Sequence, residues 1–230
     1  MSNSSFNIVQ LALVAVLAVV ASGLIVACGD ISAARETARR MQNNTQLRGI
    51  HQGLVTYSTS NSNRYPGINL DGDNDGIEIE ARFQTLLEGD YFTPEYAISP
   101  SEIDPAIVEW DGTSPLTNLN YSFAMLQVSD ANPDKEDHEQ GRRTEWGQTL
   151  NSQAVVMSDR NTGISGSPTS VHTTNSQSAW SGGVLWNDNH VMFETVDTFL
   201  TKYGGGTENP SDKLFEAAGD YDAYLIHAGN

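Results

Sequence analysis

Two patterns of apolar and polar positions follow each other along the first 60 residues. Residues 6–28 carry no charge and are apolar almost throughout. Beyond them apolar residues recur mostly three or four positions apart, the period of an α-helix. They are Ile31, Ala34, Ala38, Met41, Leu47, Ile50, Leu54 and Tyr57. No proline occurs before Pro66, so the pattern predicts one continuous helix from about Phe6 to Ser60.

After Pro66 the pattern changes to short apolar segments separated by turn-forming residues. It predicts a short helix at 83–88 ended by Gly89, strands at 119–128 and 154–158, a hairpin of 184–186 and 191–194, a helix at 213–218 and a closing strand at 223–227. The Ser-, Thr- and Gly-rich residues 163–183 predict a long surface loop. The expected fold class is α+β: a long N-terminal α-helix, transmembrane and then amphipathic, packed on a small, mainly antiparallel β-sheet.

The uncharged run is long enough to cross a membrane, since about 20 apolar residues span a bilayer core. It admits three interpretations: a cleaved signal, a retained anchor, or a lipoprotein signal. The segment Ile25–Cys28, IVAC, resembles a lipobox in which Cys28 would be lipidated. A secretory signal usually opens with basic residues, but this chain begins MSNSS. The helical pattern that continues past Cys28 favours a retained membrane helix.

Charge is distributed unevenly along the chain, whose net charge is −17. Residues 30–64 hold five Arg against Asp30 and Glu36, whereas residues 65–230 hold seven basic and 27 acidic residues, a net −20. Such an acidic domain would repel phosphate backbones, so we expect no nucleic-acid partner. Cys28 is the single cysteine, so the chain can form no intrachain disulfide.

A run of alternating acidic residues is the sharpest local motif. In Asp71-Gly-Asp73-Asn-Asp75-Gly, carboxylates at alternate positions converge on a hard cation and the second glycine permits a sharp turn. The carbonyl of Ile77 can follow them. Arg82 occupies the place of the closing Glu of an EF-hand, so Glu78, Glu80 or a remote acid such as Asp90 would complete a Ca²⁺ shell. The alternative is a solvated acidic turn held by Asx hydrogen bonds.

A second motif, Asp188 and His190, lies in the turn of the expected hairpin. The two residues form either a metal or acid/base pair, or simply a turn Asp and a strand-edge His. No Gly-x-Ser-x-Gly nucleophile elbow occurs, and Gly204-Gly205-Gly206 lacks the Lys of a phosphate loop. We therefore expect no enzymatic activity. The four tryptophans are expected to pack in the core or under loops rather than to form a sugar-binding platform.

The N-terminal helix resembles that of type IV pilins and type II secretion pseudopilins. Phe6-Asn-Ile-Val-Gln10 stands in the place of Phe-Thr-Leu-Ile-Glu, with which many of their mature chains begin. The segment from Ala34 to Arg40, ARETARR, matches their Ala-Arg-Glu-x-Ala-Arg-Arg. Gln42 to Tyr57 and Tyr65-Pro66 are similar to the segment that follows in the family.

The rest of the chain resembles one subgroup, which carries a C-terminal motif of His, nine residues and Asp-Gly. Ala97 to Glu102 is similar to Phe-x-Cys-Pro-Ser-Asp of that subgroup, with Ser99 in the Cys place. Ala154 to Asp159 is similar to a strand of the subgroup that ends in Leu-Ala-Asp. The segment from Gly182 to Val191 is similar to its sequence Gly-Gly-Val-x-x-Leu-Phe-x-Asp-Gly-His-Val.

Four residues depart from the family's pattern. The peptidase of the family cuts after Gly, but this chain has Ser5 in that place. In the family a Glu neutralises the N-terminus of a neighbouring subunit, and this chain has Gln10 in its place. A Gln can hydrogen-bond an amine but supplies no countercharge in hydrocarbon, where a bare ammonium is costly. Asn189 replaces the Gly of Asp-Gly, and Ser178 stands where the His would be. The processing residues at issue are therefore Ser5, Phe6 and Gln10.

The resemblance implies a structural subunit of a type II secretion or type IV pilus-like filament, made of a short leader (1–5), a transmembrane half-helix (6–28), an amphipathic half-helix (29–62) and an acidic head (63–230). Its partners would be further copies of itself, other pilin-like subunits and the inner membrane. The head would face the periplasm or the exterior, with Ca²⁺ stabilising its acidic loop. The alternative is a membrane-anchored or Cys28-lipidated binding protein that never polymerises; a weaker one is a hydrolase with a signal anchor.

Overall fold

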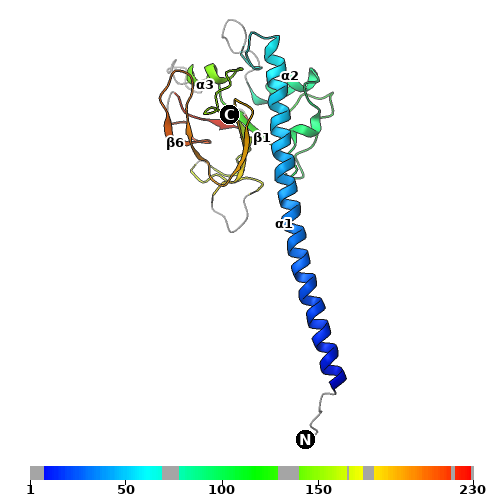
Figure 1. Cartoon of the computed structure of the whole chain (residues 1–230). Helices are drawn as coiled ribbons and strands as arrows, with labels where there is room; N and C mark the ends of the chain where they lie inside the picture. The colour runs from blue at the N-terminus through cyan, green and yellow to red at the C-terminus, as the bar shows by residue number, and fades with distance from the viewer. Residues whose placement is uncertain are drawn as a thin grey trace. The chain divides into compact units, whose positions relative to one another are not determined.

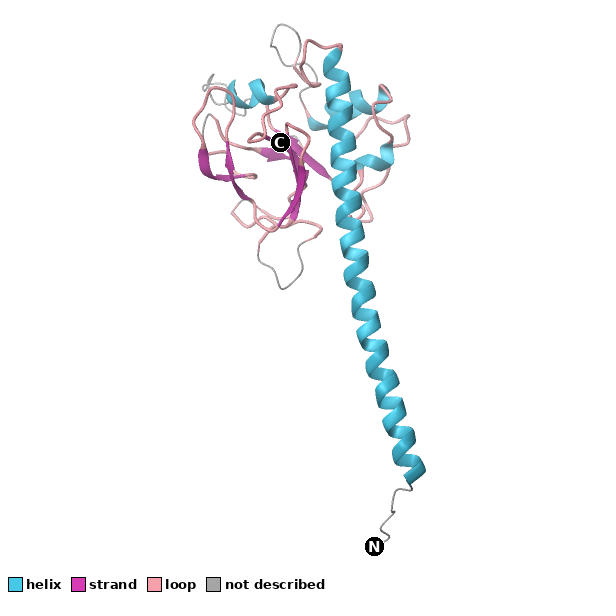
Figure 2. Ribbon diagram, in the orientation of Figure 1, coloured by secondary structure: helices cyan, strands magenta, loops and turns pink. Residues whose placement is uncertain are grey.

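The computed structural model describes residues 8–68, 78–128, 140–164, 166–172, 179–218 and 221–228, with side chains from Ile31 onwards except at Gln140. The chain forms two compact units, Met1–Met41 and Gln42–Asn230, which we call the N-terminal unit and the head unit. Helix α1, Ile8–Thr59, contributes to both, and every other helix and strand belongs to the head unit (Figures 1 and 2). The predicted α+β class, with an N-terminal helix and an antiparallel sheet, is confirmed.

Helix α1 follows the predicted helical period. In the head unit its apolar positions Leu47, Ile50 and Leu54 are completely buried. The helix ends in the polar segment after Thr59, where Ser62 and Asn63 adopt left-handed φ values of 55° and 62°. Few L-residues adopt that conformation, and Asn is among those that tolerate it best, so this polar segment stops the helix.

A glycine inside α1 has a packing role. A Cβ added at Gly49 would lie 2.7 Å from Cε1 of Tyr96, in the 3₁₀ helix η1, Pro94–Ala97. That separation is too short for a real contact, so the missing side chain lets η1 approach the helix closely. The cost of glycine in a helix interior, about 1 kcal/mol relative to Ala, is offset by this contact.

The main sheet of the head unit has five antiparallel strands in the order β4-β3-β2-β1-β7. Strands β3 and β4 form the predicted hairpin around Asn187 to His190, and β2 and β7 are likewise confirmed. The central strands β1, β2 and β3 are buried at every position, so both faces of the sheet are covered. The strands are β1 Phe123–Leu126, β2 Val155–Asp159, β3 Gly182–Trp186, β4 Val191–Glu194 and β7 Leu225–Ile226.

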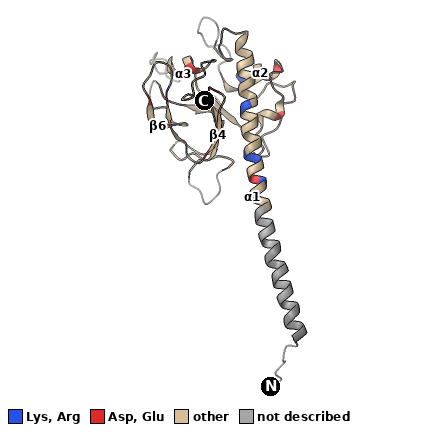
Figure 3. Cartoon of the chain, viewed as in Figure 1, with Lys and Arg blue, Asp and Glu red and all other residues tan. Residues whose placement is uncertain are grey.

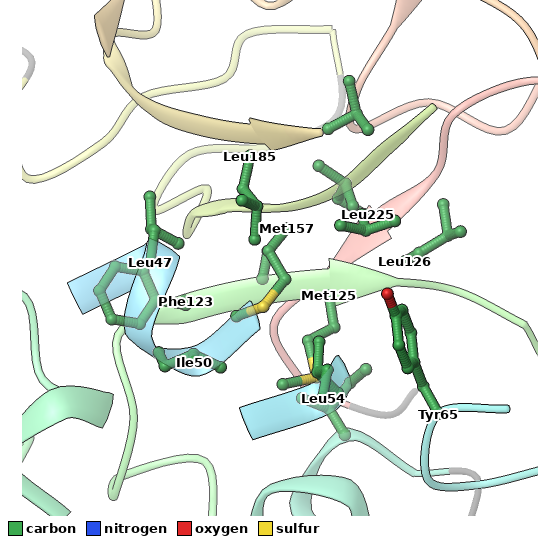
Figure 4. Packing of buried hydrophobic residues seen from close by; sticks show 14 of the residues in the cluster. Leu47, Ile50, Leu54, Tyr65, Phe123, Met125, Leu126, Met157, Leu185 and Leu225 are labelled. Carbon is green, nitrogen blue, oxygen red and sulfur yellow. The ribbon is translucent and has the colours of Figure 1, made fainter. Parts of the chain in front are cut away.

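The core of the head unit lies between α1 and this sheet. Leu47, Ile50 and Leu54 of α1 face Met125 of β1 and Met157 of β2 (Figure 4). Burying the three α1 side chains contributes on the order of 6 kcal/mol, at about 2 kcal/mol each. The tryptophans Trp146, Trp180 and Trp186 are also buried, as expected from the sequence, whereas Trp110 is half-buried.

Further elements complete the head unit. Helix α2, Ile79–Glu88, confirms the predicted short helix with Gly89 at its C-cap, although it begins four residues earlier than expected. A short helix α3, Gln140–Glu145, and a two-stranded antiparallel sheet were not anticipated. That sheet consists of β5, Thr198–Thr201, and β6, Asn209–Lys213.

Three sequence predictions need correction. The helix expected at 213–218 is absent, because Lys213 pairs with Thr198 in the small sheet. The Leu214 backbone N–H donates to the Asp197 carbonyl, and the Leu214 carbonyl accepts from the Leu225 N–H. The strand expected at 119–128 is shorter, because the side chain of Asn120 closes a turn on Thr117.

The expected surface loop at 163–183 is the third correction. Of its described residues, Ser170, His172, Trp180 and Ser181 are buried, and Gly182 and Gly183 already belong to β3. The other described residues before β3 are exposed or half-buried and form no helix or strand, so the loop prediction holds for them and only the buried residues correct it.

Candidate functional site

The helical segment Ile31–Met41 exposes apolar side chains. Ile31 is 53% and Met41 67% exposed, and Ala34 and Ala38 are exposed as well. These four residues are spaced i, i+3, i+7 and i+10, which places them on one face of the helix. A row of exposed apolar side chains on one helix face is typical of a surface that contacts another helix.

Basic side chains accompany this apolar row. Figure 3 marks the positions of Lys and Arg residues as blue bands on the ribbon of the described part of α1. Arg40 pairs with Glu36 one turn earlier at 3.1 Å, a surface contact worth about 0.3 to 0.5 kcal/mol. Arg35 and Arg39 are exposed, lie one turn apart, and make no ion pair with any residue that the structure describes.

From Ile31 onwards, where the side chains of α1 are described, Asn43 is the first buried polar residue, and it anchors the helix to the sheet. Its Nδ2 donates to Asp159 Oδ2 at 2.9 Å, and its Oδ1 accepts from the Ser99 hydroxyl at 2.8 Å. The same Asp159 oxygen accepts the backbone N–H of Gly183 at 2.6 Å, and His172 Nε2 lies 3.1 Å away. One buried carboxylate thus joins α1, the end of β2 and the start of β3.

Glycine at position 183 makes this arrangement possible. A Cβ there would lie 2.7 Å from Leu47 Cδ1 and 2.8 Å from Asn43 Nδ2. Any larger residue would have to displace the ends of the Leu47 and Asn43 side chains, and moving the Asn43 amide would disturb its bond to Asp159. The Gly-Gly pair at the start of β3 therefore serves close packing of the helix on the sheet.

A second buried anchor is centred on Asn187, the first residue of the β3–β4 turn. Its Oδ1 accepts a hydrogen bond from the Tyr65 hydroxyl at 2.8 Å and lies 3.4 Å from His51 Nε2. Its Nδ2 donates to the carbonyls of Glu145 and Gly147, at 2.6 and 2.9 Å, and to the Thr149 hydroxyl at 2.8 Å. Asn187 therefore joins α1, the segment after it, the end of α3 and the hairpin.

Burial controls the protonation of the ionisable groups at this anchor. Burial lowers the pKa of His51, although contacts to Asn187 and Asn189 oppose the shift. Burial also raises the pKa of Tyr65 well above its ordinary value. Both side chains are therefore neutral at neutral pH, which suits a buried network of hydrogen bonds.

The candidate calcium residues are only partly described. Asp71, Asp73, Asp75 and Ile77 lie outside the described residues. Glu78 is exposed directly before α2, and Glu80 lies in its first turn. Burial raises the pKa of the Tyr121 phenol, and the charge of Glu80 adds to that shift. Among described residues no three His, Cys, Asp or Glu side chains lie together as metal ligands would.

Arg82, which occupies the EF-hand position of a closing Glu, points into the core. It is completely buried, donates from Nη1 to the Leu126 carbonyl at 2.8 Å, and stacks over Trp146 at 4.9 Å. Burial lowers its pKa to about 9, and the charge of Glu78 opposes that shift. Arg82 therefore joins α2 to β1 and Trp146, and it takes no part in binding a cation.

Asp188 and His190 are brought together in the hairpin turn. The Asp188 carboxylate accepts the His190 backbone N–H at 3.1 Å and also contacts the ring nitrogen Nδ1. The imidazole stacks on Trp186, with ring centroids 4.3 Å apart. Within the described ranges no third metal-ligating side chain joins the pair. The two side chains thus contact each other in the turn directly before β4.

The remaining candidate residues lie at the N-terminus. Ser5 and Phe6 fall outside the described residues, and the backbone of Gln10 and Cys28 is helical. A search of the described residues finds no helix that is both long and apolar enough to cross a membrane.

Sequence reasoning missed both buried anchors. Asn43, Asn187 and His51 are polar residues within apolar patterns, and their long-range partners are invisible in a single sequence. Asp159 carried a weak signal, because a buried strand that ends in Asp must satisfy that carboxylate. Compared with known proteins, the chain matches no protein family, no curated protein and no solved structure.

Proposed function

We propose that this chain is a pilin-like or pseudopilin-like structural subunit of a type II secretion or type IV pilus-like filament. The observation that supports it best is the change in burial along α1. From Asn43 the helix buries an apolar face in the head unit, whereas Ile31–Met41 exposes an apolar row. One helix is thereby divided between holding its own head and presenting a surface to partners.

The exposed row is a reason to expect partner helices. A helix without tertiary contacts is only marginally stable in water, and most of its stability comes from packing an amphipathic face. Parallel packing of several copies would cover Ile31, Ala34, Ala38 and Met41 together. The small side chains of the two alanines would allow close approach between helices. Further copies of the chain and other pilin-like subunits are the proposed partners.

The uncharged residues 6–28 supply the proposed membrane anchor. Before assembly they would span the inner membrane once, with the acidic head in the periplasm or outside the cell. In the filament the same segments would pack among themselves, away from water. The work of this protein is then assembly rather than catalysis.

The acidic loop is the proposed Ca²⁺ site of the head. Asp71, Asp73 and Asp75 would supply carboxylates, and Ile77 its carbonyl. Glu78 suits the closing position, because its exposed side chain is free to turn towards the loop. Glu80 is the weaker candidate, since it is half-buried in the first turn of α2.

A matched pair of variants, in which one of two alanines is replaced by aspartate, tests the proposal. Ala38→Asp puts a charge into the apolar row, and Ala33→Asp puts the same charge on an exposed position outside it. Filaments sheared from cells that express a prepilin-type secretion system should contain the wild type and Ala33→Asp, and lack Ala38→Asp. Filaments that incorporate both variants equally, or no filament with the wild type, would contradict it.

A non-polymerising membrane-anchored binding protein is the second candidate. It is favoured by Ser5 and Gln10, which depart from the residues that processing and filament incorporation use in the pilin family. Lipidation at Cys28 is a variant of the same candidate. In either form the chain would stay monomeric in the membrane, and neither alanine substitution would alter its state of association.

A further inference from the structure

The head unit contains an open cavity of about 420 Å³ between the end of α2, the start of η1 and the loop around Trp110. Two half-buried aromatic side chains, Phe92 and Trp110, line it together with three carboxylates, Glu88, Asp90 and Asp111. All of its lining residues are described, and none of them is basic. The cavity therefore places three carboxylates beside aromatic surface, and no basic side chain in its lining balances their charge.

The walls of this cavity are held in place by the fold. The Trp110 indole donates to the Ser114 carbonyl at 2.7 Å, and the Asp111 carboxylate accepts the backbone N–H groups of Thr113 and Ser114. These backbone bonds, that of Ser114 foremost, lower the pKa of Asp111 to about 2, so the carboxylate is charged at neutral pH. The Phe92 ring packs edge-on against Phe83 of the core, 6.4 Å away.

This lining selects for one kind of ligand. A cation over an aromatic ring is attracted by the negative face of its π-system, and a carboxylate beside the ring adds ion pairing. The planar guanidinium of Arg does both at once, since it stacks on aromatic rings and binds carboxylates in a fork. A hydrated point charge such as Ca²⁺ would gain nothing from Phe92 and Trp110.

The same chain carries the complementary group. Residues 30–64 have five Arg against two acidic residues, whereas residues 65–230 have a net charge of −20. Arg35 and Arg39 are exposed one helical turn apart, next to the apolar row of Ile31 and Ala38.

We propose that this cavity is a docking site for a second copy of the chain, which inserts Arg39, with Arg35 beside it, between Trp110 and the carboxylates. The inference rests on the proposed function, because it assigns the head's contact in the same self-association. The helix row would supply apolar contact between copies, and the cavity would fix their register. Rising salt would weaken this contact, because Arg35 and Arg39 are exposed.

Charge reversal with rescue tests the proposal. The full chain is purified in detergent, and sedimentation velocity at low and high salt gives the dissociation constant for self-association. Arg39→Glu and Glu88→Arg should each weaken association by at least about tenfold, and the double variant should recover to within about threefold of the wild type. Lys213→Glu and Glu216→Arg are the controls, because they make the same charge changes in an exposed pair outside the cavity.

The outcomes separate this inference from the function on which it rests. If the wild type associates but the two reversals behave like their controls, or if the double variant is weaker than either single one, the docking site is wrong and the filament proposal stands. If the wild type does not self-associate at all, the filament proposal fails with it. Both reversed side chains are exposed, and unchanged thermal unfolding of each variant confirms that the head is folded.

Discussion

Asn43 and Asp159, 116 positions apart in sequence, form a buried hydrogen bond of 2.9 Å. It lies at the first buried residue of α1 after Ile31 and at the end of β2. Asp159 Oδ2 also holds the backbone of β3 through Gly183, so one carboxylate sets the position of the helix on two strands. We regard this bond as the device that fixes α1 to its own head.

Breaking this bond should cost far more than a surface change. Asn43→Ala leaves a buried carboxylate with one partner fewer, so we expect a loss of about 2 to 3 kcal/mol in the free energy of unfolding. Denaturant unfolding of Asn43→Ala, Asp159→Asn and the double variant measures the coupling between the two residues. Gln52→Ala, on the exposed side of the same helix, should change the free energy by less than about 0.5 kcal/mol. Additive effects of the two substitutions would refute the coupling.

The Asn187 anchor predicts an unusually damaging isosteric change. In Asn187→Asp the amide that donates to the carbonyls of Glu145 and Gly147 becomes an oxygen, which repels both. We expect a loss of about 3 kcal/mol or more, or failure to fold. Asn120→Asp also removes an amide–carbonyl bond, to Val108, but in an exposed loop, and should cost about 1 kcal/mol or less. If urea unfolding gives the same loss in free energy of unfolding for Asn187→Asp and Asn120→Asp, the hydrogen bonds of the Asn187 anchor are not cooperative.

Asp212 in β6 predicts a pH dependence. Burial raises its pKa to about 6, although hydrogen bonds from Thr201 and the Ala223 backbone oppose the shift. Because the folded state holds this proton more tightly than the unfolded chain, whose value is 3.8, stability falls as pH rises from about 4 to 6. After allowance for solvent screening the loss is on the order of 1 to 2 kcal/mol.

The variant Asp212→Asn isolates that contribution. Relative to the wild type it should gain stability between pH 4 and pH 7, since the amide oxygen still accepts both bonds but carries no charge. Glu109→Gln, at an exposed position, should follow the wild type across the same range. A constant difference between Asp212→Asn and the wild type at all pH values would rule out titration of Asp212 as the cause.

Calcium removal predicts a loss of thermal stability in the head. If Asp71, Asp73 and Asp75 bind Ca²⁺, chelation should lower the melting temperature, because binding to the folded state alone stabilises it by mass action. Asp73→Asn in Ca²⁺ should resemble the chelated wild type and respond little to chelator. An unchanged melting temperature, with Ca²⁺ shown by elemental analysis to be stripped, would remove the metal from the account.

Local patterns predicted the elements that depend on them. The helical period of α1, the turn-forming residues from Asn187 to His190 and the short apolar segment at β2 each predicted the right element. The small sheet of β5 and β6 was missed, because residues 213–218 were expected to form a helix, whereas Lys213 pairs with Thr198 of β5. Propensity yields to tertiary contacts in such short segments.

The polar anchors could not be predicted, for a related reason. Asn43, His51 and Asn187 are ordinary polar residues until the fold brings partners from over 100 residues away. The sequence shows only that Arg82 stands where an EF-hand would have its closing Glu. The structure gives Arg82 a packing role through its contact with Trp146. Chemistry that depends on long-range geometry lies beyond the reach of a single sequence.

The mass of the mature N-terminus tests the central claim most directly. The chain is purified from the membrane of a cell that has a prepilin peptidase, and its N-terminal peptide is measured by mass spectrometry. A filament subunit should begin at a methylated Phe6, which requires cleavage after Ser5. A chain that begins at a lipidated Cys28, or retains Met1, would contradict the filament account and identify a static membrane anchor.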